Sequence, residues 1–318
     1  MHRLYAQLCR FSSDEWERAI DALSPSINEI DRNATRIWFA FWPLNLSMAL
    51  AKAPDPAMLA RKLGLMGRWK LADQVDESHR FLFAHRYWPQ IKNAIQTDRD
   101  WPADLRAIVE AVSDAAARIT RTDREMLLGI AAVGLMTLRQ VGAEAFAAAP
   151  GAIHLSQETR RRSAHQVLRR RGRDDWQGVL GFLRGPKKRW TVTFDENTPD
   201  ASFRVISGQE IATAAQSDKR EYRADDPRCT PGEGPIPVEC RAASCGTCWI
   251  GVLAGAEKLS PMVERDERKR MDVFGYPVGR ETKPLIRLAC QARAFGAVSI
   301  VIPPWNGVFG AAVRTPKS

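Results

Sequence analysis

Four of the six cysteines of this 318-residue chain, all in its last third, follow a spacing that suits a metal centre. Cys240, Cys245 and Cys248 follow the pattern C-x4-C-x2-C, and Cys290 comes after a long gap. Four thiolates at this spacing suit a 2Fe–2S cluster, and four thiolates also suit a structural zinc ion. Zinc sites usually pair two C-x2-C units, and this chain has one. The spacing therefore favours iron and one-electron chemistry.

The loop that carries three of these cysteines is built from small residues. Between and beside the cysteines lie Ala242, Ala243, Gly246 and Thr247. Small side chains let backbone N–H groups approach cluster sulfur, and Gly246 has the least restricted backbone. The two alanines and Thr247 are candidates for a thin cover between the cluster and solvent. We expect a bulky or β-branched residue at position 246 to impair the site.

The residues around the fourth cysteine lead into a strand. Residues 287–293 read RLACQAR, and the alternating run 297–302 follows before two prolines. With this context, residues 189–305 resemble a 2Fe–2S ferredoxin of the β-grasp fold. The cysteine loop has the plant-type spacing, whereas the sequence around the fourth cysteine resembles the adrenodoxin branch. The resemblance implies that Cys240 and Cys245 bind one iron and that Cys248 and Cys290 bind the other.

The same resemblance assigns the other elements of this part of the chain. We expect strands at 189–194, 203–207 and 249–253, a helix near 209–216, and a segment at 260–276 that resembles the family's sequence before the fourth cysteine. Asn197, Pro199 and Asp200 favour a turn between the first two strands. Residues 217–239 form an insertion that contains Cys229 and many prolines and glycines. Its length departs from the family pattern, so its role is an open question.

The amino-terminal half is predicted to be a different, helical domain. Eight of the ten tryptophans come before or at the start of the first ferredoxin-like strand. Ser12 and its neighbours offer N-cap residues, and prolines separate periodic apolar segments, which predicts five to seven helices and no strand before about residue 150. The expected fold is therefore α+β multidomain: an all-α domain at 1–157, a connector at 158–188 and a β-grasp 2Fe–2S ferredoxin-like domain at 189–318.

Two apolar runs raise the question of a membrane. Residues 126–138 are shorter than the roughly 20 residues that a transmembrane helix needs, and residues 37–44 are interrupted by Pro43. We expect both to be core segments, with peripheral membrane contact as the alternative for the second. The first twenty residues lack the apolar stretch of a signal peptide. We therefore expect no transmembrane span and a cytoplasmic protein, whose cysteines stay reduced rather than forming disulfides.

The net charge of +10 comes almost entirely from the connector. Residues 158–189 contain 11 Lys and Arg against 3 Asp and Glu, while the parts on either side are nearly neutral. Such a run is often a solvated helix face or hinge, and it can also attract an acidic protein, an anionic membrane or nucleic acid. The hinge interpretation stays open beside docking to a protein, which is favoured among the functional ones because no nucleic-acid-binding motif accompanies the arginines, with an acidic partner as the hypothesis.

No second cofactor is indicated by the sequence. On a helix, His79 and His85 would lie about 240° apart, so we interpret them as ordinary core or polar residues rather than as a metal-binding pair. Motifs for a P-loop, a dinucleotide-binding turn or a serine nucleophile are absent from the sequence.

An electron carrier is therefore favoured over a self-sufficient enzyme. The predicted function is transfer of one electron between protein redox partners, a reductase or another oxidoreductase, with the helical domain as a docking module. Two alternatives remain open: an iron–sulfur subunit of an oxidoreductase complex, and a cluster-based redox sensor. Cys9 and Cys229 are interpreted as small apolar residues, although either thiol could be redox-active.

Overall fold

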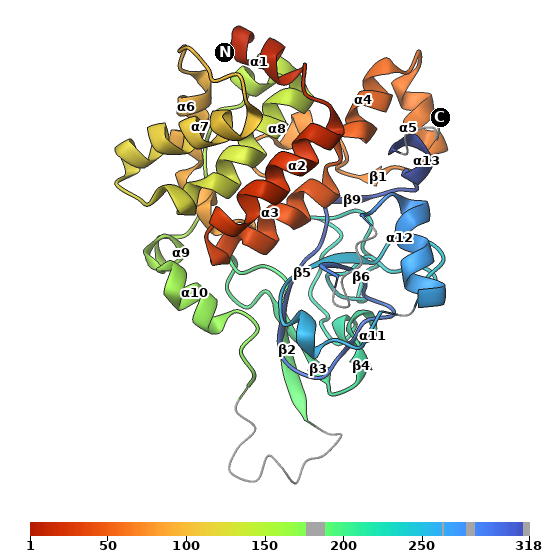
Figure 1. The fold of residues 1–318 in the computed structure, drawn as a ribbon. Coiled ribbons are helices and arrows are strands. Elements are labelled where there is room, and N and C mark those ends of the chain that lie inside the picture. Colours follow the sequence, from red (N-terminus) through yellow and green to blue (C-terminus); the bar gives the residue numbers. More distant parts are fainter. Residues whose placement is uncertain (176–187, 263, 278–283, 314–318) are drawn as a thin grey trace. The chain divides into compact units, whose positions relative to one another are not determined.

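The computed structural model describes residues 1–175, 188–262, 264–277 and 284–313, and it divides into two compact units (Figure 1). Unit 1 comprises residues 1–48 and 70–164, and unit 2 comprises residues 49–69 and 165–318. The predicted connector is thus shared between the units, and its residues 176–187 lie outside the described chain. Segment 49–69, which the sequence analysis placed in the helical domain, is part of unit 2.

Unit 1 is helical, as predicted. It contains α1 (His2–Leu8), α2 (Ser13–Leu23), α3 (Glu29–Phe41), the start of α4 (Leu44–Lys52), α6 (Trp88–Gln96), α7 (Leu105–Thr120), α8 (Arg124–Ala148), α9 (Gln157–Arg161), and the 3-10 turns η1 (Ser24–Ser26), η2 (Leu71–Gln74) and η3 (Phe83–Tyr87). The predicted N-cap is confirmed, because the hydroxyl of Ser12 accepts the N–H of Glu15 and the Glu15 carboxylate accepts the N–H of Ser12. Eight α-helices begin before residue 150, which exceeds the predicted five to seven.

Helix α8 forms the centre of unit 1, with α1, α3, α6 and α7 packed around it. Its residues 127–138 are all buried. Two glycines permit close packing: a Cβ at Gly129 would overlap Thr35, and one at Gly134 would lie 2.9 Å from the ring of Trp88. Within the described residues α8 is the one helix long and apolar enough to cross a membrane, and 72% of its apolar window is buried inside the structure. Burial of this kind is typical of a core helix.

Unit 2 is built on a five-stranded mixed sheet in the order β3-β2-β8-β5-β6 (Figure 1). Its strands are β2 (Arg189–Thr193), β3 (Ser202–Ile206), β5 (Trp249–Ala254), β6 (Ile286–Leu288) and β8 (Val298–Val301). Strand β2 is antiparallel to β3 and parallel to β8. The β2–β3 hairpin is thus joined to β8, the strand of this sheet that follows the fourth cysteine. Helix α11 (Ile211–Ala215) packs against β3. The expected ferredoxin-like fold is confirmed, because the strands predicted at 189–194, 203–207, 249–253 and 297–302 join one mixed sheet.

Smaller elements complete unit 2. Strand β4 (Gln209–Glu210) pairs with β7 (Arg293–Ala294), and α5 (Pro56–Lys62), α10 (Ala164–Arg170), α12 (Lys269–Phe274), α13 (Gly310–Val313), the 3-10 turn η5 (Ala256–Lys258) and the π-helical turn η6 (Glu264–Arg268) lie outside the sheet. Strand β1 (Met66–Gly67) pairs with β9 (Trp305–Asn306). The expectation of no strand in the amino-terminal half is therefore wrong at β1. Its two residues are too short to produce an alternating pattern.

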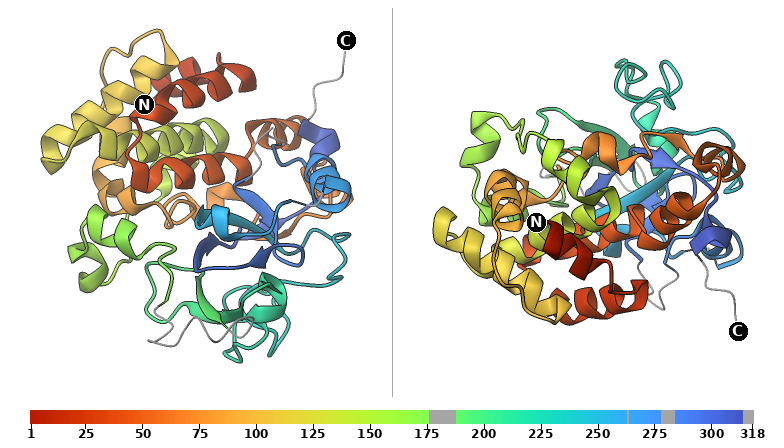
Figure 2. Two further views of the ribbon diagram at one scale, coloured as in Figure 1. Left: turned by 60° about the horizontal axis from the view of Figure 1, so that its bottom comes forward. Right: turned by 90° about the horizontal axis from the view of Figure 1, so that it is seen from above.

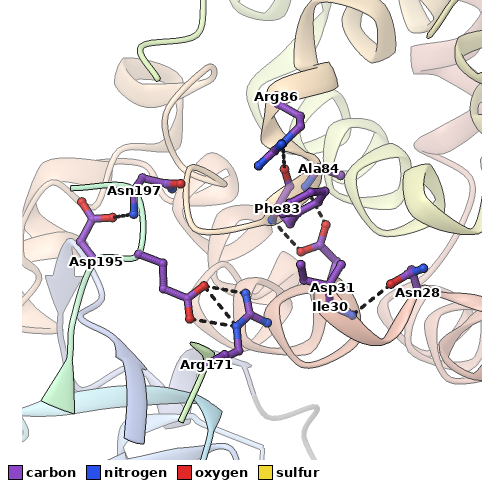
Figure 3. A network of polar contacts seen from close by, with 10 residues as sticks. Asn28, Ile30, Asp31, Phe83, Ala84, Arg86, Arg171, Asp195 and Asn197 are labelled. Carbon is purple, nitrogen blue, oxygen red and sulfur yellow. Dashed lines mark hydrogen bonds and ion pairs between the residues drawn. The ribbon is translucent and has the colours of Figure 1, made fainter. Parts of the chain in front are cut away.

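One arginine of the basic connector is part of the fold rather than a free charge. The guanidinium of Arg171 binds the carboxylate of Glu196 through two nitrogens, at 2.7 to 3.1 Å, and its side chain is only 4% exposed (Figure 3). Arg169 and Arg170 on α10 are exposed. The described part of the connector thus contains both a structural arginine and solvated ones.

Candidate functional site

The first three cysteines lie on the loop between α11 and β5, where the backbone turns sharply. Arg241, Ala243 and Gly246 adopt left-handed φ angles of 52°, 56° and 68°. This geometry turns successive N–H groups inward, and the Sγ of Cys240 accepts those of Ala242, Ser244 and Cys245 at 3.3 to 3.5 Å. Backbone N–H groups that converge on a sulfur stabilise its negative charge. The loop therefore directs three backbone N–H groups at one sulfur, whereas of the three residues expected to cover the cluster only Ala242 is exposed and Ala243 and Thr247 are buried.

Strand pairing brings the third and fourth cysteines together. Cys248 immediately precedes β5 and Cys290 follows β6, and Trp249 pairs with Leu288 in this antiparallel ladder. The N–H of Ala289 donates to the carbonyl of Cys248 at 2.9 Å, which fixes the two loops to each other. Both cysteines are buried, with 2% and 3% exposure.

The four thiols form two contact pairs, and hydrogen bonds make two of them acidic. Cys248 donates to Cys290, which lowers the pKa of Cys290 to about 7 and, together with burial, raises that of Cys248. Burial would raise the pKa of Cys240, but hydrogen bonds from the side chain of Ser244, from the backbone of Ala242 and from Cys245 lower it to about 6. Thiolate is the form that binds metal, so these hydrogen bonds favour the ligand form of Cys240 and Cys290, whereas Cys248 must lose its proton when it binds.

Gly246 has the tightest surroundings in the cysteine loop. A Cβ at this position would overlap the ring of Phe274, the last residue of α12. Phe274 packs edge-on against Trp249, with 5.8 Å between ring centroids, so the loop lies against an aromatic wall. The expected sensitivity of position 246 thus has a specific cause, and the sequence analysis did not identify Phe274.

A buried ion pair anchors the backbone before Cys290. The carboxylate of Glu267 accepts the guanidinium of Arg287 at 2.8 and 2.9 Å and the N–H of Leu288 at 2.7 Å. Arg287 also donates to the carbonyl of Ser260, and both charged residues are at most 2% exposed. A bidentate pair with an additional backbone bond fixes direction as well as distance. Sequence reasoning noted Arg287 but not Glu267, which lies 20 residues earlier with no pattern linking the two.

The remaining two cysteines lie elsewhere. Cys9 is exposed at the end of α1 in unit 1. Cys229 is buried in the 217–239 insertion, its Sγ lies 3.5 Å from the carbonyl of Pro235, and burial raises its pKa to about 12. A thiol with so high a pKa stays protonated at neutral pH, which favours the interpretation of Cys229 as a small apolar residue.

The two histidines that sequence reasoning separated are in contact. Residues 75–82 form turns rather than a helix, and the Nδ1 atoms of His79 and His85 lie 2.9 Å apart in the core of unit 1. Their expected core position is correct, but the helical spacing used to separate them is wrong. The carboxylate of Asp31 holds this turn by accepting the N–H groups of Phe83 and Ala84 (Figure 3). In the described part of the chain, no three His, Cys, Asp or Glu side chains are grouped to hold a single metal ion.

The comparisons with known proteins bear on this site. Residues 230–295 match the family model of the 2Fe–2S iron-sulfur cluster binding domain. A plant-type ferredoxin of Pseudomonas putida is 33% identical over 90 residues, which is 28% of this chain and 66% of that relative, slightly less than two thirds of its length. No solved structure shows a significant match.

These findings and the mixed sheet define an iron–sulfur protein with a ferredoxin-like domain in its carboxy-terminal part. The predicted cofactor, a 2Fe–2S cluster, and the iron–sulfur redox role are confirmed. The matched region spans the cysteine loop, the fourth cysteine and Glu267, so the residues that shape the two ligand loops all fall within it.

Proposed function

We propose that Cys240, Cys245, Cys248 and Cys290 bind the 2Fe–2S cluster and that the protein carries one electron at a time between protein redox partners. The observation that carries the proposal is that the two loops place these cysteines in two hydrogen-bonded pairs, Cys240 with Cys245 and Cys248 with Cys290. Two thiolates per iron is the requirement of a cluster with four cysteine ligands.

The residues around the thiols stabilise the charge of the ligand sulfurs and shield one side of the site from water. The backbone N–H groups at Cys240 and the amide of Gln291, 3.5 Å from the Sγ of Cys290, offset the negative charge of the ligands. Cys248 and Cys290 face the interior, whereas Ala242 and Ser244 are exposed, so water is excluded on one side and a partner can approach on the other. When bound, the cluster supplies reversible one-electron reduction.

For the whole chain we propose a cytoplasmic electron carrier whose partner is a reductase or an oxidoreductase. The predicted domain limits, 1–157, 158–188 and 189–318, are replaced in this proposal by the two compact units, because segment 49–69 belongs to the ferredoxin-like one. Unit 1 would serve as an interaction module. Its buried helical core supports independent folding, since α8 is surrounded by helices of the same unit.

Serine substitution of each cysteine tests the ligand assignment. Changing Cys240, Cys245, Cys248 or Cys290 to Ser should abolish the visible absorption of the cluster and lower the iron content of anaerobically purified protein. The matched control is Cys229→Ser, which removes a buried thiol of the same unit outside the two loops. Retention of a full cluster in the Cys290→Ser protein would overturn the assignment.

A further inference from the structure

Segment 49–69 is built into the ferredoxin-like unit by backbone pairing. Strand β1 pairs with β9, the N–H of Arg68 donates to the carbonyl of Pro304 at 2.8 Å, and the N–H of Val308 donates to the carbonyl of Leu63 at 2.7 Å. The chain leaves unit 1 within α4, adds α5 and β1 to unit 2, and returns to unit 1 at Lys70. This segment lies outside the region that matches the family model.

The 217–239 insertion packs against the segment. The side chain of Arg228 is 4% exposed and binds the carboxylate of Asp226, the Oδ1 of Asn306 at 3.1 Å and the carbonyl of Pro303 at 2.5 Å. Gly67 lies against Arg228, because a Cβ there would be 2.9 Å from the arginine Cδ and Nε and 2.5 Å from the carbonyl oxygen of Pro304. The insertion whose role the sequence left open therefore binds β9 and packs against β1 through Arg228.

The surface formed by α5, β1, α12 and the turn after β9, here called the α5 face, exposes apolar side chains. Four of the seven large apolar residues that are exposed in the described chain belong to it: Met58 at 58%, Met66 at 40%, Val273 at 43% and Val308 at 42%. In Figures 1 and 2, α13 lies between α5 and α12, and the turn after β9 is bonded to the ends of both helices, since the N–H of Val308 donates to the carbonyl of Leu63 and that of Phe309 to the carbonyl of Phe274. Clustered exposed apolar residues mark interaction sites more often than single ones do.

The α5 face is also basic. Segment 49–69 contains four Lys or Arg residues and one acidic residue, Asp55, whose side chain is engaged as the N-cap of α5. Lys52, Arg61 and Lys62 are exposed, and the last two lie at the carboxy-terminal end of α5. An apolar centre with basic side chains beside it is complementary to an acidic protein surface, because opposite charges steer the encounter and apolar contacts retain the partner.

Packed aromatic rings join this face to a cysteine of the cluster site. Trp305 of β9 packs on Phe309 at 5.2 Å between centroids, Phe309 on Tyr276 at 5.5 Å, and Tyr276 on Trp249 at 4.8 Å. Trp249 follows Cys248 directly in the chain, and all four rings are at most 3% exposed. A partner on the α5 face would thus be separated from Cys248 by close-packed, water-free protein.

We propose that the α5 face is the docking surface for an acidic protein redox partner, which rests on the function proposed above. In this arrangement the amino-terminal half contributes to docking through segment 49–69, which the fold makes part of the electron-carrying unit. The exposed arginines of the connector are then not needed for docking.

Stopped-flow electron transfer to two haem proteins tests the proposal. The chemically reduced holoprotein is mixed with ferric cytochrome b5, an acidic protein, or with ferric cytochrome c, a basic one; one electron leaves the cluster and reduces each haem iron from ferric to ferrous. The double variant Arg61→Glu/Lys62→Glu should slow transfer to cytochrome b5 about ten-fold at about 0.01 M ionic strength. At about 1 M the difference should vanish, because the Debye length falls to about 3 Å.

The matched control reverses two exposed charges on the connector. Arg169→Glu/Arg170→Glu changes the net charge by the same amount on α10 of the same unit. This variant should leave the rate with cytochrome b5 within about two-fold of wild type, because a charge away from the docking contact acts on the partner only at long range and is screened more strongly. Met58→Gln should lower the rate at high as well as low ionic strength, since apolar contact is not screened. With cytochrome c, Arg61→Glu/Lys62→Glu should not slow transfer.

Several results would overturn the proposal. Equal slowing by the connector variant would show that only net charge matters. Slowing by Arg241→Glu in the cysteine loop, with none from the α5-face variant, would place docking over the cluster loop instead. Reduction of ferricyanide, a small acceptor, tests the electron-carrier function separately from the docking surface. If every variant reduces ferricyanide at the wild-type rate, the electron-carrier function stands even where the docking proposal fails.

Discussion

At the scale of single residues, the cysteine spacing and Gly246 could be predicted from the sequence, because cluster ligation imposes a local pattern. Phe274 and Glu267 could not, because they reach the site through the fold. Phe274 comes from α12, and Glu267 lies on the turn before that helix. The same applies to the His79–His85 contact, which depends on irregular turns that carry no periodicity.

Position 246 permits a prediction with an internal control. Gly246→Ala should lower the cluster content strongly, because its Cβ overlaps the ring of Phe274 and its φ is left-handed. Gly232→Ala has a similar φ of 73° with nothing within 4 Å of its Cβ, so it should cost only about 1 kcal/mol of stability. Iron per chain measures the difference. Equal effects of the two changes would show that backbone strain, not the aromatic contact, limits position 246.

The buried ion pair gives a second prediction. Glu267→Gln leaves Arg287 buried without its counter-charge, so it should destabilise the ferredoxin-like unit by about 3–5 kcal/mol and shorten the lifetime of the cluster. The exposed pair of Glu210 and Arg293 is the control, since Glu210→Gln should cost less than about 1 kcal/mol. Urea unfolding measures the change in stability of each variant, and the loss of visible absorption with time measures the lifetime of its cluster. A Glu267→Gln protein as stable as the control would refute the anchoring role.

At the scale of elements, the long strands and the helical character of the first half were predictable, and short elements were not. Strands β2, β3, β5 and β8 begin and end within two residues of their predicted limits, because alternation of apolar residues is a local signal. Strand β1 has two residues and a partner near the other end of the chain. Nothing local distinguishes such a segment from a loop.

The buried histidine pair leads us to predict that unit 1 becomes less stable at acidic pH. Burial lowers the pKa of His85 from 6.5 to about 4, with Arg80 and His154 adding to the effect, and lowers that of His79 as well. The unfolded chain takes up a proton on His85 as the pH falls through about 6.5, whereas the folded chain does so only near 4. The contribution of His85 to the free energy of unfolding is therefore fully present above pH 6.5. It is lost as the pH falls from 6.5 to 4, and the loss amounts to about 3 kcal/mol.

Thermal unfolding followed by helical circular dichroism checks this prediction. The unfolding temperature of the wild type should fall between pH 7 and pH 4, and His85→Asn should reduce that dependence. His165→Asn, at an exposed position of the connector, is the control and should behave like wild type. A His85→Asn protein with the wild-type pH dependence would assign the acid sensitivity to other groups.

At the scale of the whole molecule, the two fold classes were predictable and the division of the chain between them was not. Composition and charge change near residue 158, but segment 49–69 crosses that division to pair with β9. We therefore predict that residues 165–318 alone lose their cluster faster than the full chain, because β9 and Arg228 lack their partner. Adding a peptide of residues 49–69 should slow the loss, and a scrambled peptide should not. No effect of the authentic peptide would contradict the role of the segment.

The most direct test of the central claim is the metal and electron content of the full chain purified without oxygen. A 2Fe–2S centre held by the four cysteines predicts about two irons and two acid-labile sulfides per chain, and uptake of one electron to give a paramagnetic reduced state. A colourless protein that contains zinc and takes up no electron would contradict the account.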